Sequence, residues 1–557
     1  MTVLAKPPIA PASPHNGAAP AGDFVTRLLA EQRDLTAVER FARVHEADSP
    51  PAQAKYYRDL IPLTTPGAGE QYAFEVDLDA CTGCKACVSA CHSMNGLEPT
   101  ETWRAVGLLQ GTDDQFPILQ HVTTACHHCL EPACLAGCPT NAYEKDPITG
   151  VVSHLDDQCF GCQYCTMACP YEVPQYSKTK GIVRKCDMCH GRLAAGEAPA
   201  CVQACPSQAI RIRITPRELT KAEASGRGLL PGAPDSEFTK PTTRYLGADR
   251  LPAGTAPADA AHASPQHAHW PLIIMLTLIQ MGVGAFAVLS PLRWWAGGGE
   301  AFVALAALTA MGATGVALAA STLHLGRPTY AFRAVLGWRH SWLSREAIAF
   351  GAFAGPASAV TAYALLPYLP FQPPLEPPQA LRVPLEAFTP IAGAVGVYCS
   401  IRIYQFTRRV FWIGLGTASR FWLTSAVLGP ALVLACWSLT QNAGAVSHGL
   451  AAWIILAATT KLLFEASILR PSAETHPSQR LTGQLMTGPL AAVTGARFAA
   501  GVLGGVVLPL AGLAAGGAVA AAISCTSLGL LVVGELAERT LFFGAVIPLR
   551  MPGGIKP

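Results

Sequence analysis

Cysteines are the residues of this sequence whose spacing points most directly to chemistry. Sixteen of the nineteen cysteines lie in four groups of four. The first three groups are CTGCKACVSAC, CHHCLEPACLAGC and CFGCQYCTMAC, and the fourth, CDMCHGRLAAGEAPACVQAC, has eleven residues between its two pairs. Cys399, Cys436 and Cys525 lie outside the groups in apolar segments, and we expect them to be small buried hydrophobic residues. The grouped residues are Cys81, Cys84, Cys87, Cys91, Cys126, Cys129, Cys134, Cys138, Cys159, Cys162, Cys165, Cys169, Cys186, Cys189, Cys201 and Cys205.

The spacing of these cysteines favours 4Fe–4S clusters. Two residues between cysteines allow successive thiolates to bind different irons of one cluster, and a fourth cysteine three residues later, followed by proline, binds a second cluster. In the third group we therefore expect the first three cysteines to hold one cluster and Cys169 to reach another. Three of the four groups end in Cys-Pro, whereas Cys91 of the first group is followed by His92.

Zinc is the alternative metal. Isolated CxxC pairs often form tetrahedral zinc sites, so a zinc-rich membrane adaptor is a second hypothesis, which metal and sulfide analysis would distinguish. His127 and His128 lie inside the second group, and because the cysteine count is already complete we expect them to be solvated or bonded to the backbone. Four basic residues stand beside the fourth group, where cations would favour a reduced cluster, with a solvated surface as the equal alternative: Lys178, Lys180, Arg184 and Lys185.

The elements that position these cysteines differ from those that follow. Of the 557 residues, 50% are hydrophobic and only 14% are charged, against about 25% in a typical soluble domain. The net charge of +3 gives no argument for a nucleic-acid partner. From Trp270 on, eight apolar segments approach the roughly 20 residues that cross a lipid bilayer core, and they predict a multi-pass membrane protein: 271–291, 301–321, 346–368, 386–404, 421–439, 449–468, 498–516 and 518–536.

Two further stretches are expected to carry no chemistry. The first 22 residues, rich in proline and alanine, predict a disordered tail rather than a signal peptide, and residues 23–48 have the periodicity of packing helices. After Ile212 the sequence becomes rich in Pro, Ala and Gly, which predicts a flexible linker before Trp270. The linker histidines are expected to be solvated: His262, His267 and His269.

The cysteine-rich part resembles a known family. Residues 72–215 resemble the four-cluster iron–sulfur subunit of molybdopterin oxidoreductases of the dimethyl sulfoxide reductase family, on GVVSHLDDQCFGCQYCTMACPYEVP and KCDMCHGRLAAGEAPACVQACPSQAI. Residues of about 270–545 resemble the membrane-anchor subunit of the same family, on TLHLGRPTYAFRAVLGWRHSWLSREAIAFG and GELAERTLFFGAV. The resemblance implies two subunits fused in one chain. The fold that this resemblance implies is an α+β ferredoxin-like domain with two pseudo-symmetric two-cluster halves, followed by an all-α eight-helix transmembrane bundle.

The implied divisions of the chain follow from the same resemblance. A tail with packing helices (1–71) precedes the four-cluster domain (72–215). An extension with the linker (216–269) leads to the quinone-interacting anchor (270–545), and a short tail (546–557) follows it.

The resemblance also implies four 4Fe–4S clusters with defined ligands. In that family the first and fourth groups pair, as do the second and third. Some relatives lack the cysteine that corresponds to Cys162 and hold a 3Fe–4S cluster, so its presence implies a fourth 4Fe–4S cluster. We name each set by its first cysteine: the Cys81 set (Cys81, Cys84, Cys87, Cys205), the Cys91 set (Cys91, Cys186, Cys189, Cys201), the Cys126 set (Cys126, Cys129, Cys134, Cys169) and the Cys138 set (Cys138, Cys159, Cys162, Cys165).

A quinone site is implied in the membrane part. In the anchor family a histidine of the HLG motif and a glutamate at the start of the third helix contribute to a menaquinol site. Here these are His324 and Glu346, with Arg345 adjacent. Quinone reduction takes up two electrons and two protons, which suits a group that titrates near neutrality and a carboxylate at the membrane edge. From the residues alone, an anchor that snorkels to the interface explains them equally well.

Other charges lie inside the apolar segments. Lys461 and Glu465, four residues apart, are expected to neutralise each other. A proton path that includes them and Glu535 and Glu538 is the alternative.

Together these features predict an electron-transfer and membrane-anchor subunit. It would pass electrons between a molybdopterin catalytic subunit and membrane quinone, and quinone oxidation or reduction would be the only chemistry of this chain. A cluster-and-anchor module for a hydrogenase or a nitrite reductase route is the alternative, and co-purification of a molybdopterin subunit would distinguish the two.

Loop charges predict the orientation. Fourteen basic residues follow even-numbered apolar segments, and only Arg293 and Arg382 follow odd-numbered ones. The positive-inside rule then places the cluster domain on the cytoplasmic face of a bacterial inner membrane. Family members named for dimethyl sulfoxide reductase have their clusters outside, so the prediction favours the membrane-bound sulfite dehydrogenase type. The fourteen are Arg327, Arg333, Arg339, Arg345, Arg402, Arg408, Arg409, Arg420, Arg470, Arg480, Arg497, Arg539, Arg550 and Lys556.

Overall fold

A computed structural model describes Glu39 and residues 54–112, 117–226, 228–369, 378–470 and 476–552. The cysteine groups and the apolar segments belong to one compact unit that begins at Asp59, and the unit before it contains helix α3 (Ala54–Tyr57). Apart from Glu39, the predicted tail and packing helices before residue 54 lie outside the described residues.

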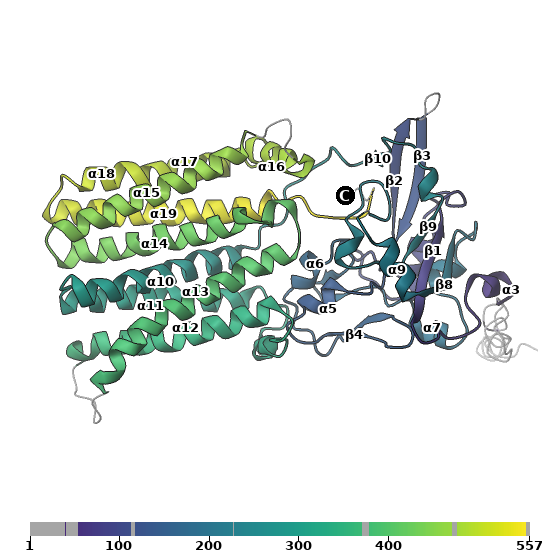
Figure 1. Cartoon of the computed structure of the whole chain (residues 1–557), viewed down its shortest axis with the longest axis horizontal. Helices are drawn as coiled ribbons and strands as arrows, with labels where there is room; N and C mark the ends of the chain where they lie inside the picture. The colour runs from purple at the N-terminus through teal and green to yellow at the C-terminus, as the bar shows by residue number, and fades with distance from the viewer. Residues whose placement is uncertain are drawn as a thin grey trace, which may run out of the picture. The chain divides into compact units, whose positions relative to one another are not determined.

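The cysteine-rich domain is built on a small sheet that joins its two ends. β1 (Glu70–Asp77) pairs antiparallel with β8 (Ile210–Pro216) and parallel with β9 (Arg244–Leu246). In β8 the apolar side chains of IRIRI alternate with arginines, and the strand period of two buries Ile210 and Ile212. The strands that precede and follow the four cysteine groups therefore lie side by side, as Figure 1 shows.

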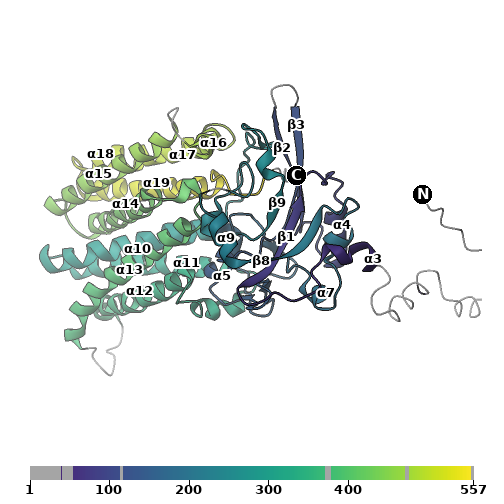
Figure 2. The same ribbon diagram turned by 45° about the vertical axis from the view of Figure 1, so that its right-hand side comes forward.

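Three further sheets and six short helices complete the domain. A long hairpin projects from it in Figure 2, with β10 at its edge: β2 (Ala105–Thr112), β3 (Pro117–Thr124) and β10 (Ala256–Pro257). The two-stranded sheets are β4 (Tyr143–Lys145) with β5 (Val152–His154) and β6 (Gln175–Ser177) with β7 (Ile182–Arg184). The helices are α4 (Ala86–Met94), α5 (Ala133–Gly137), α6 (Tyr164–Ala168), α7 (His190–Ala194), α8 (Ala200–Gln203) and α9 (Arg217–Glu223).

Residues 216–269 contain more secondary structure than their composition predicts. They contribute β9 and β10 to the sheets and form two short 3-10 helices, η2 (Ser236–Phe238) and η3 (Ala248–Arg250). Thr242 is buried, and its hydroxyl donates a hydrogen bond of 2.7 Å to the carbonyl oxygen of His127 in the second cysteine group. Polar side chains in this segment are thus buried because the cysteine-rich domain supplies their hydrogen-bond partners.

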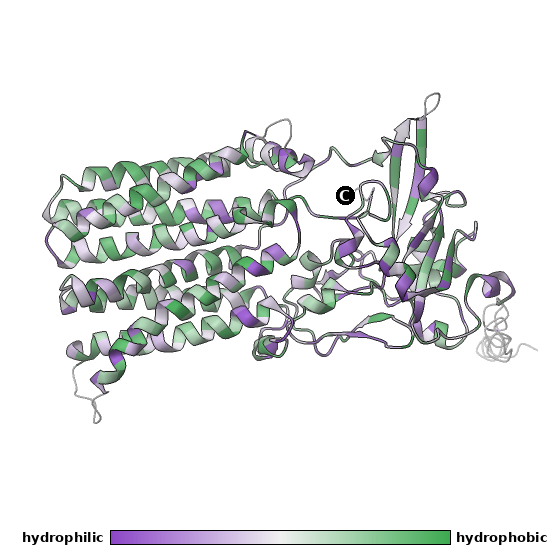
Figure 3. Ribbon diagram, viewed as in Figure 1, coloured by the Kyte–Doolittle hydropathy of each residue, from purple (hydrophilic) through white to green (hydrophobic). Residues whose placement is uncertain are grey.

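The described residues after the linker contain eight helices that are long and apolar enough to cross a membrane, which confirms the predicted number. In Figure 3, hydrophobic residues predominate along these helices. The seventh span combines α17 and α18 through a π-helical turn, Leu503–Val507, and a short polar helix, α16 (Pro477–Thr487), precedes it. The helices are α10 (Trp270–Trp295), α11 (Glu300–Leu323), α12 (Trp342–Leu365), α13 (Arg382–Phe406), α14 (Leu415–Thr440), α15 (Ala445–Ile468), α17 (Ala491–Val502), α18 (Leu508–Gly512) and α19 (Gly517–Gly544).

Helix α10 lies at the centre of the bundle, where it packs against α11, α13, α14 and α19. Its contact with α14 is a close approach of backbones, because a Cβ atom on Gly284 would come within 2.1 Å of the carbonyl oxygen of Ser425. Such small-residue contacts are typical of helix packing in lipid. Of the three ungrouped cysteines, Cys399 and Cys436 are buried as expected, whereas Cys525 is exposed on the surface of the bundle.

Candidate functional site

The four cysteine groups share one backbone turn. In the first CxxC pair of each group, the residue before the second cysteine has a positive φ: 71° at Gly83, 42° at His128, 73° at Gly161 and 61° at Met188. This left-handed conformation reverses the backbone direction from one cysteine to the next. The same turn therefore presents a cysteine pair four times in the domain, although glycine occupies it in only two groups.

Three cavities are each lined by all four cysteines of one set that the family resemblance implies. The cavity of the Cys126 set measures about 360 Å³, and those of the Cys91 and Cys138 sets measure about 280 Å³ each. In the Cys81 set, Cys81 interacts electrostatically with Cys84 and Cys205, and Cys87 also lies near Cys205. The structure thus brings the members of each set together, while their role as ligands stays a prediction.

The chemistry of these cavities fits iron–sulfur clusters. None of the sixteen cysteines forms a disulfide, and burial raises the pKa of Cys91 and of Cys169 to about 12, so these sulfurs need a cation to carry negative charge. Within the described ranges, no three His, Cys, Asp or Glu side chains converge closely enough to bind one metal ion. Sulfurs arranged around a cavity suit a core of several irons.

The sets follow one another in a row. Cys87 of the Cys81 set lies near Cys201 of the Cys91 set, and Cys186 of the Cys91 set lies near Cys126. Tyr143 lies near cysteines of both the Cys126 and the Cys138 sets. Because Cys84 is exposed, the Cys81 set forms the end of the row nearest the solvent. The order is therefore Cys81, Cys91, Cys126 and Cys138.

The charged and imidazole side chains near these cavities are buried rather than solvated. His128 is fully buried, and its Nδ1 accepts a hydrogen bond of 3.0 Å from the backbone N–H of Val152. Arg184 pairs with Glu101 at 2.8 Å, and Lys185 is only 3% exposed. Of the two interpretations that the sequence left open, the solvated surface is therefore wrong for Arg184 and Lys185, whereas Lys178 and Lys180 are exposed as that interpretation predicts.

The Cys138 set lies directly against the membrane bundle. The hydroxyl of Ser341, just before α12, donates to the carbonyl oxygen of Gly137 at 2.7 Å, and that of Ser344 donates to Pro139 at 3.3 Å. The phenol of Tyr164, two residues after Cys162, donates to the carbonyl oxygen of Ile403 at 2.9 Å. Tyr164 was not singled out from the sequence, although it lies inside the motif CFGCQYC.

The HLG motif forms a second contact with the same set. The backbone N–H of Gly326 donates to the carbonyl oxygen of Gly161, between Cys159 and Cys162, at 3.4 Å. A Cβ atom on Gly326 would lie 2.1 Å from the carbonyl oxygen of Gly181, so only glycine allows this approach. The glycine of the motif is therefore explained by packing against the cluster domain.

His324 ends helix α11 two residues before that contact. Burial, with a further effect of His269, lowers its pKa to about 4, and its Nδ1 is buried without a hydrogen-bond partner among the described residues. No hydrogen bond or ion pair joins His324 to Glu346 in the described part of the chain. The two predicted quinone-site residues thus lie on opposite flanks of the loop that packs against the Cys138 set.

Glu346 is 7% exposed and is the fifth residue of α12. It accepts a short hydrogen bond from the hydroxyl of Ser400 on α13, and it lies near Tyr164 and Tyr404. Among the described side chains, no lysine, arginine or histidine forms an ion pair with it. Glu386, at the other end of α13, contrasts with it because Arg293 and Arg382 both pair with that carboxylate.

A groove between α12 and α13 lies beside Glu346. Arg345 and Cys399, which flank Glu346 and Ser400 in sequence, contribute to its wall together with aromatic side chains. The guanidinium of Arg345 lies 4.4 Å from the centre of the Trp342 ring, which sequence reasoning also missed. Glu346 itself is buried behind the wall. The lining residues are Trp338, Arg339, Trp342, Arg345, Ile348, Ala349, Val395, Tyr398 and Cys399.

The other intramembrane charges form a buried network rather than a single pair. Lys461 lies 4.0 Å from Glu465, but it forms a shorter contact with Glu535. Arg497 pairs with Glu465 at 2.7 Å and with Glu535 at 3.1 Å. Lys461 and Glu465 thus form the predicted ion pair, but only as part of a larger network in which Arg497 is the closer partner of Glu465.

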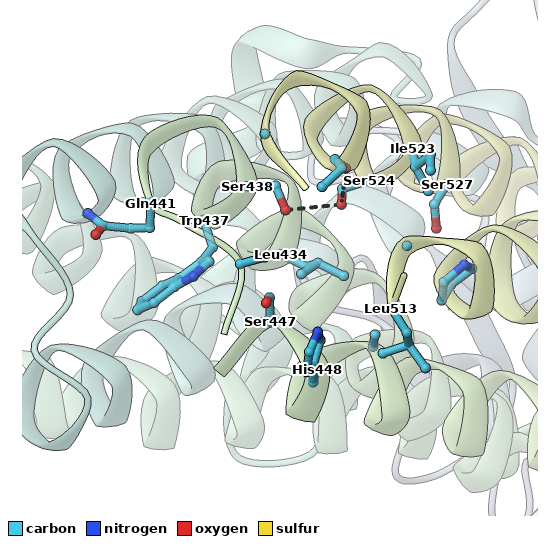
Figure 4. A pocket seen from close by; sticks show the side chains of 16 residues that line it. Leu434, Trp437, Ser438, Gln441, Ser447, His448, Leu513, Ile523, Ser524 and Ser527 are labelled. Atoms are coloured by element: carbon cyan, nitrogen blue, oxygen red, sulfur yellow. Dashed lines mark hydrogen bonds between the residues drawn. The ribbon is translucent and has the colours of Figure 1, made fainter. Parts of the chain in front are cut away.

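A separate cavity of about 500 Å³ lies among α14, α15, α18 and α19. Figure 4 shows Ser438 and Ser524 joined across it by a hydrogen bond of 3.1 Å, with His448 on its wall. This cavity is lined partly by the connections that follow the fifth and seventh spans. Gly326 and Ser341, which contact the Cys138 set, lie in the connection that follows the second span, and connections after even-numbered and odd-numbered spans lie at opposite ends of the bundle. It therefore lies at the opposite end of the bundle from the predicted site residues.

Comparison with known proteins agrees with this architecture. The family model of the DMSO reductase anchor subunit (DmsC) matches residues 265–545, and that of a 4Fe-4S dicluster domain matches residues 118–214. The B subunit of the anaerobic dimethyl sulfoxide reductase of Escherichia coli K12 is 38% identical over 179 residues, which cover 31% of this chain and 86% of the relative.

Two other relatives match the cysteine-rich domain. The probable anaerobic dimethyl sulfoxide reductase subunit YnfG of Escherichia coli K12 is 37% identical over 179 residues, or 31% of this chain and 86% of the relative. The hydrogenase-2 operon protein HybA of Escherichia coli O157:H7 is 35% identical over 199 residues, but only 60% of that relative is covered. The chain thus belongs to the DMSO reductase anchor subunit (DmsC) family, and it joins this multi-pass anchor to an iron–sulfur electron-transfer domain of the reductase B-subunit type.

Proposed function

We propose that this chain conducts electrons through four 4Fe–4S clusters between a molybdopterin catalytic subunit and a quinone bound in the groove between α12 and α13. The observation that carries the proposal is the direct contact of the Cys138 set with the residues that begin α12. Each cluster, when bound, supplies a one-electron carrier. The protein holds these carriers in one row that ends at the membrane bundle.

The groove suits a quinone for chemical reasons. Its wall combines the aromatic rings of Trp342 and Tyr398 with the guanidinium of Arg345. Aromatic and aliphatic side chains take up an apolar ring and tail, and a guanidinium donates hydrogen bonds to a quinone oxygen. Nonpolar groups such as Ile348, which is exposed on the bundle surface, border the groove, so a lipid-soluble substrate can enter from the bilayer.

Glu346 is the proton-handling group of the proposed site. Reduction of one quinone consumes two electrons and two protons, and oxidation of one quinol releases the same numbers. A carboxyl group without a cationic partner can gain and lose a proton without breaking an ion pair. The hydroxyl of Ser400 positions it through a hydrogen bond, and Tyr164 of the cluster domain lies near it. His324 is proposed to hold the loop at the other flank of the site.

The catalytic partner would bind at the other end of the row. Cys84 of the Cys81 set is exposed, so electrons can enter or leave there. The relatives that match this domain include subunits of dimethyl sulfoxide reductases and a hydrogenase operon protein. The anchor family favours the molybdopterin partner, because its model matches half of the chain.

We infer a cytoplasmic position for the cluster domain from the loop charges. Of the fourteen basic residues counted, five lie inside the spans, Lys556 lies outside the described residues, and eight arginines remain in the connections at the cluster-domain end. Arg293 and Arg382, at the opposite end, both lie inside spans. The positive-inside bias therefore persists and keeps the sulfite dehydrogenase type as the proposed one. A cytoplasmic reporter fused to the C-terminus should be active and a periplasmic one inactive; the reverse would refute this orientation.

Anaerobic cluster analysis with a quinone pulse tests the main proposal. We expect about sixteen irons per chain, from four clusters of four, and matching acid-labile sulfide. After reduction with dithionite and removal of the excess, a short-chain quinone should restore the oxidised cluster absorbance within the mixing experiment. Mainly zinc, or fewer than about twelve irons, would contradict the cluster assignment. A full complement of iron with no response to quinone would contradict the quinone site alone.

A further inference from the structure

We propose that two buried cations, Arg104 and Lys185, raise the reduction potentials of the two interior clusters, those of the Cys91 and Cys126 sets, above that of the Cys138 cluster. The inference rests on the proposed electron path and adds the energy profile along it. One electron moves from each cluster to the next, and no bond is made or broken in the step.

Arg104 lies against the Cys91 set. Its side chain is 2% exposed and lines the cavity of that set. One nitrogen, Nη1, donates to the hydroxyl of Thr123 at 3.2 Å, and that hydroxyl lies 3.5 Å from the sulfur of Cys87. The other two nitrogens, Nε and Nη2, are buried without a partner among the described residues. A guanidinium carries a permanent charge, and unpaired buried donors are costly, so these N–H groups are available to cluster sulfurs.

The ring of Phe74 supports Arg104 from the other side. The guanidinium carbon lies 4.7 Å from the centre of that ring. Among the described residues no carboxylate forms an ion pair with Arg104. Its neighbours of opposite charge are the cysteines Cys201, Cys87, Cys186 and Cys91. The charge of Arg104 is therefore directed at thiolates of the Cys91 set and, through Cys87, at the edge of the Cys81 set.

Lys185 lies between the two interior sets. It lines the cavity of the Cys126 set, while its neighbour in sequence, Cys186, lines that of the Cys91 set. The ammonium donates to the carbonyl oxygens of Val152 and Cys186, the latter at 2.9 Å. These bonds use two of its three N–H groups. They fix the ammonium between the cavities, so that its charge acts on both interior clusters.

The Cys138 set has a different environment. No lysine or arginine is among the described residues that line its cavity. Arg327, a cation that acts electrostatically on Cys159, is only half-buried, and its guanidinium donates to the carbonyl oxygen of Asp156 at the surface. Water screens such a charge more strongly than it screens a buried one. Among the described residues, the cavity of the last cluster before the membrane thus lacks a buried lysine or arginine of the kind that each interior cluster has; its one imidazole, that of His154, lies 2.9 Å from the carboxylate of Asp156.

A buried cation raises the potential because a cluster gains negative charge when it is reduced. Charges interact more strongly in the protein interior than in water, so a fixed positive charge stabilises the reduced form more than the oxidised form. The interior clusters would then hold electrons in preference to the Cys138 cluster. Electrons could be stored in the middle of the row until the quinone or the partner accepts them.

Redox titration of the anaerobic full-length chain, monitored by electron paramagnetic resonance, tests the proposal. Arg104→Gln should lower the reduced-to-oxidised ratio of the Cys91 cluster at a fixed ambient potential at least tenfold, which is about 59 mV for a one-electron couple. In Arg104→Lys, which keeps the charge, the reduction potential of the Cys91 cluster should stay close to that of the parent protein. Lys185→Met should lower the reduction potentials of both interior clusters. The resonance signal of the Cys138 cluster is identified by its change in Cys162→Ser, and the reduction potential of that cluster should be the same in the Arg104 and Lys185 variants as in the parent protein.

Surface substitutions with the same charge change serve as controls. Arg244→Gln and Lys178→Met remove exposed cations and should leave all four potentials unchanged. Unchanged interior potentials in loaded Arg104→Gln and Lys185→Met would overturn the proposal. The proposal would also be overturned if Arg104→Gln lost a cluster while Lys185→Met kept the potentials of the parent protein, because the cations would then have only a structural role. Mediators and dithionite set the potential without quinone, so failure of the quinone site would leave these results unaffected.

Discussion

The hydroxyl of Ser341 donates a buried hydrogen bond of 2.7 Å to the carbonyl oxygen of Gly137, and this bond joins the start of membrane helix α12 to the residue before Cys138. The distance between the last cluster and the groove depends on such contacts. Electron transfer across the boundary between the two domains therefore requires no mobile carrier in the proposed path.

Ser341→Ala should weaken this contact. The buried carbonyl oxygen of Gly137 loses a donor, which costs about 1–3 kcal/mol. We expect unchanged iron content and slower reoxidation of the reduced clusters by quinone, measured by stopped-flow absorbance. Ser358→Ala, which removes an exposed hydroxyl further along α12, is the matched control. Equal rates in the two variants would show that the contact does not govern this step.

Cys162→Ser should disturb one cluster only. Cys162 lines the cavity of the Cys138 set with Cys138, Cys159 and Cys165, so the Cys81 and Cys91 clusters should keep their spectra. Because the affected cluster is the one next to the membrane, dithionite should still reduce the others while quinone no longer reoxidises them. Electron paramagnetic resonance after a quinone pulse checks this. Rapid reoxidation of all remaining clusters would contradict the order of the row.

The stability of the protein should fall on acidification partly through His324. Burial lowers its pKa from 6.5 to about 4, so between these values the folded state binds fewer protons than the unfolded state. Its contribution is therefore present above pH 6.5 and is lost as the pH falls towards 4. In detergent, Tm should decrease less between pH 7 and pH 5 in His324→Gln than in the parent protein. Parallel curves would contradict a buried neutral imidazole.

The charged network in the bundle should be intolerant of single changes. Glu535 accepts hydrogen bonds from Lys461 and from the hydroxyl of Thr424, and it pairs with Arg497 at 3.1 Å. Glu535→Gln leaves two buried cations short of a carboxylate, which costs about 3–5 kcal/mol. Thermal unfolding in detergent should show a clear fall in Tm. Glu300→Gln, at an exposed helix start, should not change it.

The sequence predicted the parts with strong periodic signals. Eight apolar segments correspond to eight helices of the described ranges that are long and apolar enough to span a membrane, because long hydrophobic stretches leave the chain few alternatives. The last helix extends to Gly544 rather than to residue 536, since Glu535 and Arg539 are buried in the charged network and do not end it. Their partners come from other helices, which hydropathy alone does not reveal.

In the candidate site, too, local sequence patterns predicted some features, whereas features that depend on long-range contacts were missed. The cysteine spacing predicted iron–sulfur clusters, and the family resemblance implied the four ligand sets, three of which the structure brings around common cavities. Burial of Lys185 and Arg104, by contrast, depends on contacts with Val152 and Thr123, which are distant in sequence. The linker-like composition after Ile212 gave no sign that Thr242 bonds to the second cysteine group. Such long-range partners cannot be read from local patterns.

The most direct test of the quinone site compares Glu346→Gln with Glu386→Gln. Both carboxylates are buried and lie near helix ends of the α12–α13 pair, but Glu386 is paired with two arginines and lies away from the Cys138 set. Fully reduced protein with complete iron content is mixed with quinone, and cluster reoxidation is followed by absorbance. We predict a loss of at least tenfold in rate for Glu346→Gln and a parental rate for Glu386→Gln. A parental rate in Glu346→Gln would contradict the placement of the quinone site beside this residue.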